Sequence, residues 1–257
     1  MSRLSGKNAV VTGGASGIGL AAVTLFAREG AQVMAIDRDG EALESAVEPL
    51  AGKVVPFVAD VTDEHQVAAA VAQAGDEFGG IDILVPNAGI FGEHAHIQDC
   101  TIDSFSEVMQ VNVTGVVATM KWAIPQMIRR GGGCIVITSS VGAVVGNPGS
   151  VAYAASKHAL TAVMKVAAVE LAPHKIRVNT VNPGLVDTPM MRAIEADLSP
   201  DNPDKGRAIL QEATFLKRYV DPTEVAELIL FLAADTGGFC TGGMYMIDGG
   251  MQYCLQH

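Results

Sequence analysis

The chain has 257 residues with a formal net charge of -11, and 49% of its residues are hydrophobic. This length favours one large domain with an extensive core over two smaller ones. The acidic charge, with no cluster of lysine and arginine to offset it, disfavours nucleic acid and anionic membranes as partners.

The four cysteines, at positions 100, 134, 240 and 254, are widely scattered and form no C-x-x-C pair. This pattern favours reduced thiols over a disulfide framework. Glycines interrupt the first apolar run, which disfavours a signal peptide, and no stretch of 18 apolar residues predicts a membrane span. We therefore expect a cytoplasmic protein.

Short runs rich in β-branched residues alternate with segments of helical spacing. The runs predict strands at 8–13, 31–37, 53–60, 81–89, 134–140, 176–184 and 244–248. The helical segments are 18–29, 64–78, 102–129, 153–171 and 223–233. Several strands are apolar on both alternating sets, as in a parallel sheet covered on both faces. The sequence predicts an α/β fold, a Rossmann-like doubly wound parallel sheet in a single domain over 1–257.

The first predicted strand ends in TGGASGIG, residues 12–19, and a helical pattern begins directly after it. Gly13, Gly17 and Gly19 allow a tight turn and the close approach of a ligand to the backbone. The free N–H groups of the following helix attract a pyrophosphate. The spacing differs from the commoner G-x-G-x-x-G, so this turn alone does not separate a dinucleotide site from an ordinary strand-to-helix turn.

The second predicted strand ends in Asp37, 18 residues after Gly19. A carboxylate there can accept hydrogen bonds from both ribose hydroxyls and would repel a 2′-phosphate. This predicts NAD in preference to NADP, although Arg38 partly compensates for the negative charge. A helix cap is the ordinary alternative for such a residue, and Asp39 is better placed for it.

The segment YAASK, residues 153–157, places Tyr153 and Lys157 four positions apart and therefore on one face of a helix. A phenol with a pKa of about 10 is mostly protonated at neutral pH and is a poor base for an alcohol. A nearby ammonium would lower the pKa of Tyr153 toward neutrality. Taken alone, such a pair also occurs on many ordinary helix surfaces.

Seven stretches together resemble the classical short-chain dehydrogenase/reductase family over essentially the whole chain. They are TGGASGIG at 12–19, DV at 60–61, NAG at 87–89, Asn112, Ser140, YAASK at 153–157 and PGLVDT at 183–188. One position departs from the family pattern, because Pro86 stands where the family usually has the first asparagine of NNAG. Proline lacks a backbone donor, which is tolerable at a strand end but leaves the support of the next loop open.

The resemblance implies a catalytic set of Asn112, Ser140, Tyr153 and Lys157. Tyr153 would act as general base in oxidation and as general acid in reduction. Lys157 would hold the nicotinamide ribose and pass protons onward, and Asn112 would fix a water through its backbone. Ser140 would donate a hydrogen bond to the substrate oxygen. Composition alone equally allows Ser139, but the family spacing, thirteen residues before the tyrosine, selects Ser140.

The resemblance also implies where the cofactor binds. Asp60 and Val61 would border the adenine, Asn87 would lie near the adenosine ribose, and Thr188 would hold the nicotinamide carboxamide. The full set of expected cofactor-binding residues is Gly13, Ser16, Gly17, Ile18, Gly19, Asp37, Asp60, Val61, Asn87, Ala88, Gly89, Tyr153, Lys157, Pro183, Gly184, Val186 and Thr188.

Residues 185–216 form the longest interruption of the alternating pattern and contain three prolines. This segment resembles the mobile loop that closes over the substrate in this family. The expected substrate contacts are Ser140, Val141, Asn147, Tyr153, Leu185 and Met190, together with Phe91, which predicts a pocket for a neutral or weakly polar alcohol. The HAH triplet at 94–96 lacks a third ligand at recognisable spacing, so no metal site is expected.

We therefore predict an NAD-dependent oxidoreductase that interconverts a small-molecule secondary alcohol and its ketone. One alternative is an NADPH-linked 3-oxoacyl thioester reductase acting on acyl carrier protein, which would need a basic pocket where Asp37 stands. Another is a non-catalytic NAD-sensing protein, a kind of relative that commonly loses the tyrosine or the lysine. The family resemblance also implies a homotetramer.

Overall fold

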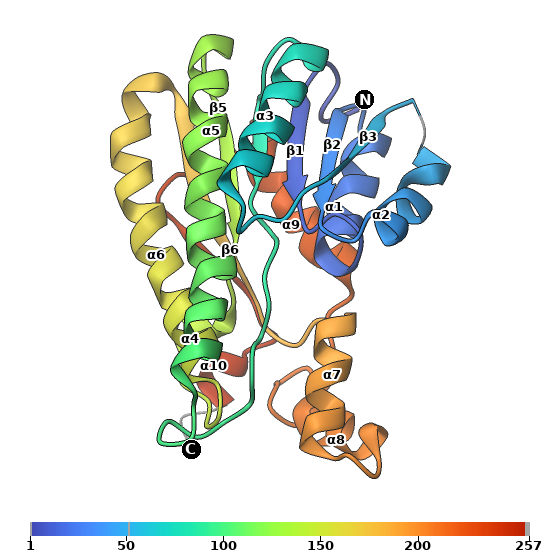
Figure 1. Ribbon diagram of the computed structural model, residues 1–257, viewed down its shortest axis with the longest axis vertical. Helices are drawn as coiled ribbons and strands as arrows, with labels where there is room; N and C mark the ends of the chain where they lie inside the picture. Colours follow the sequence, from blue (N-terminus) through green and yellow to red (C-terminus); the bar gives the residue numbers. More distant parts are fainter. Residues whose placement is uncertain (1, 51, 255–257) are drawn as a thin grey trace.

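Seven parallel strands form one sheet in the order β3-β2-β1-β4-β5-β6-β7 (Figure 1). The computed structural model describes residues 2–50 and 52–254. The strands are β1 (Asn8–Thr12), β2 (Gln32–Asp37), β3 (Val54–Val58), β4 (Ile83–Val85), β5 (Gly133–Thr138), β6 (Ile176–Pro183) and β7 (Met244–Ile247). The predicted strands and the Rossmann-like single domain are confirmed.

Helices cover both faces of the sheet (Figure 1). One face is packed by α1 (Gly17–Arg28), α2 (Gly40–Val47) and α9 (Pro222–Ala233), and the other by α3 (Glu64–Phe78), α5 (Gly115–Arg130) and α6 (Val151–Leu171). The remaining α-helices are α4 (Ile102–Met109), α7 (Pro189–Leu198), α8 (Pro203–Gln211) and α10 (Met251–Cys254). Short helical turns are η1 (Glu48–Leu50), η2 (Gln110–Thr114), η3 (Val141–Ala143), η4 (Ala172–His174) and η5 (Asp235–Gly237).

The interior strand β1 explains why the sheet needs both helical layers. All its residues are buried. Val10 joins the core beneath α3, α5 and α6, whereas Ala9 and Val11 join the core beneath α1 and α9. Since successive side chains of a strand point to opposite faces, the apolar run Ala9–Val11 has to be covered on both sides.

Aspartates begin several of the helices. The Asp39 side chain accepts a hydrogen bond from the Ala42 N–H at 3.0 Å and caps α2. This confirms Asp39, and not Asp37, as the cap. Asp221 and Glu224 form a reciprocal capping box at the start of α9.

The segment 185–216 differs from the expected loop, since it folds into α7 and α8. Thr188 caps α7 with Pro189 directly after it, and Asn202 caps α8 with Pro203 directly after it. Proline at the first helical position costs no hydrogen bond and has a helical φ. These two prolines therefore begin helices, although the sequence predicted a loop at both positions.

The predicted helix 102–129 is also interrupted. The chain passes from α4 through the π-helical turn η2 into α5, and Asn112 lies in that turn. π-Turns insert an extra residue into a helix and are frequent at functional sites.

The sheet order places a crevice between β1 and β4. The chain runs outward from β1 to β3 on one side, and from β4 to β7 on the other. Loops that leave the carboxyl ends of these two strands part there, which is where doubly wound folds bind their ligands. Within the described part of the chain, no helix has both the length and the apolar character needed to cross a bilayer.

Candidate active site

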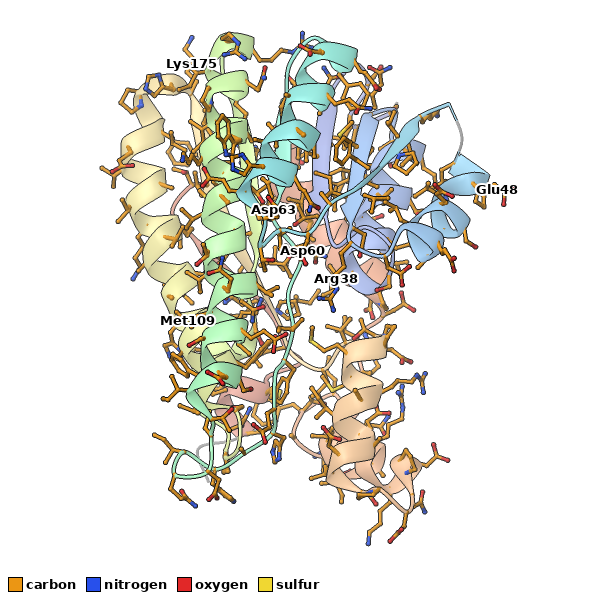
Figure 2. All side chains as sticks on the ribbon, viewed as in Figure 1. Arg38, Glu48, Asp60, Asp63, Met109 and Lys175 are labelled. Carbon is orange, nitrogen blue, oxygen red and sulfur yellow. The ribbon has the colours of Figure 1, made fainter. Side chains whose placement is uncertain are left out.

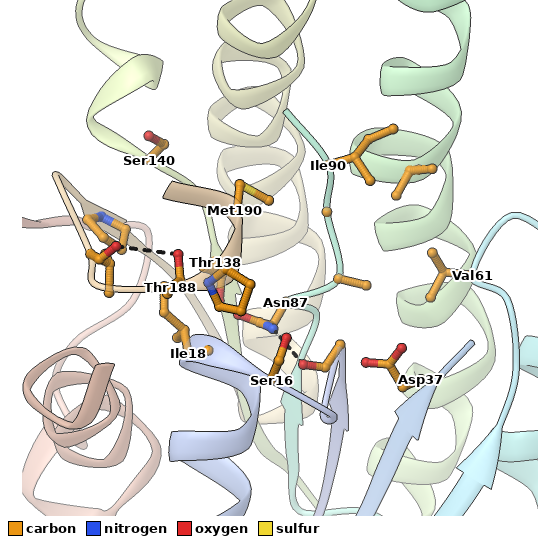
Figure 3. Close-up of a pocket in the computed structure, with 18 of the residues that line it drawn as sticks. Ser16, Ile18, Asp37, Val61, Asn87, Ile90, Thr138, Ser140, Thr188 and Met190 are labelled. Atoms are coloured by element: carbon orange, nitrogen blue, oxygen red, sulfur yellow. Dashed lines mark hydrogen bonds between the residues drawn. The ribbon is translucent and has the colours of Figure 1, made fainter. Parts of the chain in front are cut away.

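A cavity of about 290 Å³ opens at the carboxyl ends of the central strands (Figure 3). Asp37 and Val61 lie at one end of it, Ser140 and Met190 at the other, and Ser16 and Asn87 between them (Figure 3). Every expected cofactor-binding residue except Gly19 lines this cavity.

The glycine turn supplies the floor of the cavity. Gly13 and Gly17 have φ values of 67° and 53°, a region that side-chain-bearing residues rarely adopt. A Cβ at Gly17 would lie 3.1 Å from the Thr188 methyl group on the opposite wall. Gly19 does not line the cavity, and a Cβ there would overlap the Gly13 carbonyl oxygen. It allows α1 to pack closely against the end of β1, and the start of α1 then faces the cavity.

The carboxylate of Asp37 is held at the end of β2. It accepts hydrogen bonds from the Ala15 N–H at 3.0 Å and from the Asp39 N–H at 3.2 Å. Asp60 lines the same end of the cavity, with the exposed Arg38 at its rim (Figure 2). Two carboxylates at this end fit hydroxyl donors better than they fit a phosphate.

The loop after β4 is tied to the end of β1. The Thr12 hydroxyl oxygen accepts from the Asn87 N–H at 2.9 Å and from the Ala88 N–H at 3.1 Å. The Asn87 side chain donates to the Thr12 carbonyl oxygen at 3.0 Å. Thr12 therefore supplies the support that the Pro86 substitution left open, and sequence reasoning gave Thr12 no such part. Its signal is its position directly before the glycine turn.

Tyr153 and Lys157 lie on one face of α6, as the spacing predicts. The Lys157 ammonium nitrogen is 5.5 Å from the centroid of the Tyr153 ring. Lys157 is buried, with 4% of its surface exposed, and its Nζ donates to the Thr138 carbonyl oxygen at 3.1 Å. Since an ammonium has three donors, a Lys157 side chain bonded to Thr138 retains donors for other groups in the cavity.

The two candidate serines have different surroundings. The buried Ser139 hydroxyl donates to the Lys157 carbonyl oxygen at 3.3 Å and so links β5 to α6. Ser140 caps the turn η3, its Oγ accepts from the Gly142 N–H at 3.1 Å, and it lines the cavity together with Tyr153.

Asn112 is fully buried and uses its side chain to hold two elements together. Its Oδ1 accepts from the Ile90 N–H at 2.8 Å, and its Nδ2 donates to the Ile90 carbonyl oxygen at 2.9 Å and to the Ser156 hydroxyl at 3.0 Å. A Cβ at Gly89 would come within 3.1 Å of Asn112 Oδ1 and 3.6 Å of Lys157 Nζ. The turn η2 thus fixes the loop after β4 close to the lysine.

Burial shifts the pKa values of both groups on α6. It lowers the pKa of Lys157 from 10.5 to about 8, because the apolar surroundings disfavour the ammonium. It raises the pKa of Tyr153, and the neighbouring Ser140 side chain opposes that rise. The expectation that the lysine lowers the pKa of Tyr153 is therefore wrong for the protein by itself, since desolvation of the phenolate is the larger effect.

A second cavity of about 270 Å³ adjoins the first and is mostly apolar. Ser140, Val141, Asn147, Tyr153, Leu185 and Met190, the expected substrate contacts, all line it, as does Phe91. The Phe91 and Tyr153 rings lie 5.0 Å apart between centroids. His94 also lines this cavity, and further parts of the wall that the sequence did not predict include Ile194, Asp197, Leu198, Leu210, Ala213 and Met251.

Two further polar residues support the site without having been predicted. The Asn182 side chain donates to the Ser140 carbonyl oxygen at 2.9 Å and accepts from the Thr180 hydroxyl at 2.7 Å. Both polar side chains lie on the buried strand β6. Polar side chains at positions that the strand pattern assigns to the core are the signal that could have identified them.

No cluster of three His, Cys, Asp or Glu side chains with metal-binding geometry occurs in residues 2–50 and 52–254. All four cysteines in these ranges are free thiols. Burial raises the pKa of Cys134 to about 11, so this thiol stays protonated at neutral pH.

The sequence is similar to known proteins over nearly its whole length. A model described as Enoyl-(Acyl carrier protein) reductase matches residues 13–252. The 3-oxoacyl-[acyl-carrier-protein] reductase FabG of Thermotoga maritima is 42% identical over 97% of this chain and 99% of its own length. Cyclopentanol dehydrogenase of a Comamonas species is 39% identical over 97% of this chain and 98% of its own.

Solved structures give a similar picture. Levodione reductase has a TM-score of 0.95 and 32% identity, covering 99% of this chain and 100% of its own. A 3-ketoacyl-(acyl-carrier-protein) reductase from Brucella melitensis, complexed with NADH, has a TM-score of 0.90 and 32% identity, covering 97% of this chain and 99% of its own.

Proposed function

The chain belongs to the classical short-chain dehydrogenase/reductase family, and from this premise we propose that it is an NAD-dependent oxidoreductase interconverting a secondary alcohol and its ketone. Membership makes it an oxidoreductase acting on CH–OH groups with a nicotinamide cofactor. The NAD preference, the substrate class and the residue roles are the proposal.

One observation carries the proposal. Ser140 and Tyr153 line both the cavity at the glycine turn and the apolar cavity beside it. Hydride transfer requires the cofactor and the substrate carbon to be in contact, so the reaction belongs where two such cavities share a wall. The shared wall carries a phenol that can take the hydroxyl proton and a serine hydroxyl that can donate a hydrogen bond to the negative charge developing on the substrate oxygen.

In alcohol oxidation, Tyr153 accepts the hydroxyl proton while Ser140 donates a hydrogen bond to the substrate oxygen as negative charge develops. Bound oxidised NAD would supply the hydride acceptor and a positive charge beside the phenol. That charge, added to the Lys157 ammonium, would favour the phenolate and oppose the effect of burial. In the reverse direction Tyr153 returns the proton to the ketone oxygen.

Lys157 can both accept and release a proton near neutral pH, because its pKa is about 8. It would pass the proton from Tyr153 toward solvent and hold the nicotinamide ribose through its remaining donors. The Asn112 backbone would hold a water on that route, and its side chain keeps the Ile90 loop in place.

The NAD preference rests on Asp37. Its carboxylate is already oriented by two backbone N–H groups and still lines the cavity, so it can accept from ribose hydroxyls without moving. A 2′-phosphate at that position would meet negative charge at short range. Turnover with NAD and with NADP, compared on the purified protein, tests this preference; faster turnover with NADP would refute it.

A second candidate is the reduction of 3-oxoacyl thioesters, which the Thermotoga maritima relative carries in its name. Among the described residues, no lysine or arginine lines the substrate cavity, whereas the phosphate of an acyl-carrier arm favours basic contacts. The volume of about 270 Å³ and the apolar lining fit a compact neutral alcohol.

The protein would act in the cytoplasm as a homotetramer. In support of assembly, α5 and α6 carry exposed apolar side chains, with 40% of Trp122, 56% of Val166 and 76% of Val169 accessible. Such side chains on neighbouring helices suit packing against another copy. Light scattering of the purified protein should give four times the chain mass.

The deciding experiment is a substrate panel monitored by NADH absorbance. We expect oxidation of cyclic and other compact secondary alcohols and little reduction of 3-oxoacyl thioesters. Faster reduction of the thioesters would favour the second candidate. NAD binding without turnover of any alcohol or ketone would favour a non-catalytic NAD sensor, despite the retained Tyr153 and Lys157.

A further inference from the structure

The helices α7 and α8 form a hairpin that contributes to both cavities. The hairpin lies beyond the carboxyl ends of the strands, at the lower right of Figure 1. Val186 and Thr188, at its beginning, line the cofactor cavity. Ile194 and Leu210, on its two helices, line the substrate cavity. A shift of the hairpin would therefore move one wall of each cavity.

Arg207 on α8 binds the hairpin to its own starting point. Its guanidinium donates to both carboxylate oxygens of Asp187, at 3.3 Å and 2.9 Å. A third hydrogen bond, at 3.2 Å, goes to Glu195 on α7. The guanidinium carbon also lies 4.1 Å from the centroid of the Tyr219 ring. Arg207 thus contacts Asp187 just before α7, Glu195 within α7 and Tyr219 after α8.

These contacts are next to Val186 and Thr188, which form the wall that the hairpin gives to the cofactor cavity. Asp187 stands between Val186 and Thr188, and its N–H donates to the Val220 carbonyl oxygen at 3.1 Å. The Val220 N–H donates to the Leu185 carbonyl oxygen at 2.9 Å. The two ends of the hairpin are therefore paired through their backbones, and Arg207 binds the side chain of Asp187, one of the paired residues.

Arg207 is hard to replace because two of its partners are buried. Glu195 is 3% exposed and Tyr219 is 6% exposed, whereas 24% of the Arg207 side chain is accessible. Without the guanidinium, the Glu195 carboxylate would be left buried beside Asp187 with like charge. Lysine keeps the charge but lacks the planar fork that contacts two carboxylates and stacks on a ring.

We propose that Arg207 is a positioning residue that holds the α7–α8 hairpin so that the cofactor wall and the substrate wall are in place together. It touches neither ligand and acts through Asp187 and Glu195. The consequence for catalysis rests on the proposed function, whereas the consequence for the hairpin itself does not.

The test compares Arg207→Lys with Arg192→Ala. Arg192 donates to the same Asp187 carboxylate at 3.0 Å, but its side chain is 63% exposed, which makes it a matched control. In Arg207→Lys we expect the dissociation constant for NAD and the KM for the alcohol each to rise by about tenfold. The expected change in kcat is less than about threefold, with an unchanged pH profile, because the chemical groups stay in place. Arg192→Ala should stay within about twofold of the unaltered protein on every measure.

A second readout needs no ligand. Hydrogen exchange of the amides of α7, measured by mass spectrometry, should accelerate in Arg207→Lys and not in Arg192→Ala. The exchange measurement tests the positioning role of Arg207 independently of the proposed function. Absence of turnover with any alcohol would refute the proposed function and leave the exchange result unaffected.

Tyr219 supplies the remaining variants. Its hydroxyl is buried without a hydrogen-bond partner in the described ranges, so Tyr219→Phe should behave like the unaltered protein. Tyr219→Leu removes the stacking surface and should move exchange and NAD affinity in the same direction as Arg207→Lys. Should Arg207→Lys fail to fold, Tyr219→Leu decides the matter. Equal behaviour of Arg207→Lys and Arg192→Ala, or of Tyr219→Leu and Tyr219→Phe, would overturn the proposal.

Discussion

The two sides of the site are held by different kinds of interaction. The side made by β5, η2 and α6 carries Ser140, Asn112, Tyr153 and Lys157, and its hydrogen bonds run between buried groups. The other side, made by α7 and α8, is held largely by ion pairs of Asp187 and Glu195 with arginines that are partly exposed, although Glu195 itself is buried. Buried networks of this kind are rigid, whereas partly exposed ion pairs are weak one by one.

This difference assigns distinct tasks to the two sides. The chemistry belongs on the side anchored in the sheet, where a displacement would break several buried hydrogen bonds. Selection of the substrate belongs on the hairpin, where helices can shift at low cost. The comparison predicts that changes on the sheet side alter kcat and stability, and that changes on the hairpin alter binding.

The largest effect is expected on the sheet side, from Tyr153→Phe. The ring and its contact with Phe91 remain, but the proton acceptor is lost, so turnover should fall by roughly 10³-fold or more. NAD binding, measured by fluorescence titration, should be unchanged. Turnover close to that of the unaltered protein would remove Tyr153 from the reaction.

The next effect concerns stability and separates Lys157 from an ordinary buried residue. Burial lowers the pKa of Lys157 from 10.5 to about 8, so between these values the unfolded lysine keeps its proton while the folded one loses it. The free energy of unfolding therefore rises with pH in this window. Relative to Lys157→Met, the unaltered protein should gain about 1–3 kcal/mol between pH 8 and pH 10 in urea titrations.

Burial raises the pKa of Tyr153 above its ordinary value of about 10, so the phenol stays protonated over most of this pH range and adds little to the difference. A difference in unfolding free energy that stays constant across this pH range would mean that Lys157 has the same pKa in the folded and the unfolded protein.

The smallest effect is expected on the hairpin, from Leu198→Ala. Leu198 lines the substrate cavity and is 44% exposed, so truncation removes only part of a contact. The KM for the alcohol should rise by about threefold, with kcat and the NAD dissociation constant unchanged. A fall in kcat larger than the rise in KM would contradict the division between the two sides.

The sequence predicted the sheet side well and the hairpin poorly, for physical reasons. Tyr153 and Lys157 share a helix, so their proximity follows from the helical repeat alone. Ser140 and Asn112 were placed by family resemblance; Ser140 lines both cavities, whereas Asn112 lies behind the wall, bonded to Ile90. Tyr153 was wrongly expected to have a lowered pKa in the protein alone, because a sequence pattern does not report how deeply a pair is buried.

The hairpin depends on contacts that leave no local pattern. Pro189 and Pro203 suggested a loop, whereas capping residues directly before them make each a helix start. Arg207 and Asp187 are 20 residues apart and meet only through the fold. Met251 reaches the substrate cavity from the C-terminal helix, a position that no spacing rule connects with Leu185.

The central claim is that Tyr153, beside Lys157, moves the proton where the two cavities meet. The most direct measurement is the pH dependence of kcat/KM for alcohol oxidation in the unaltered protein and in Lys157→Met. The account predicts a rise with pH to a plateau, with a midpoint below the ordinary phenol pKa of about 10 that moves upward in the variant. A pH-independent rate, or the same midpoint in both proteins, would contradict it.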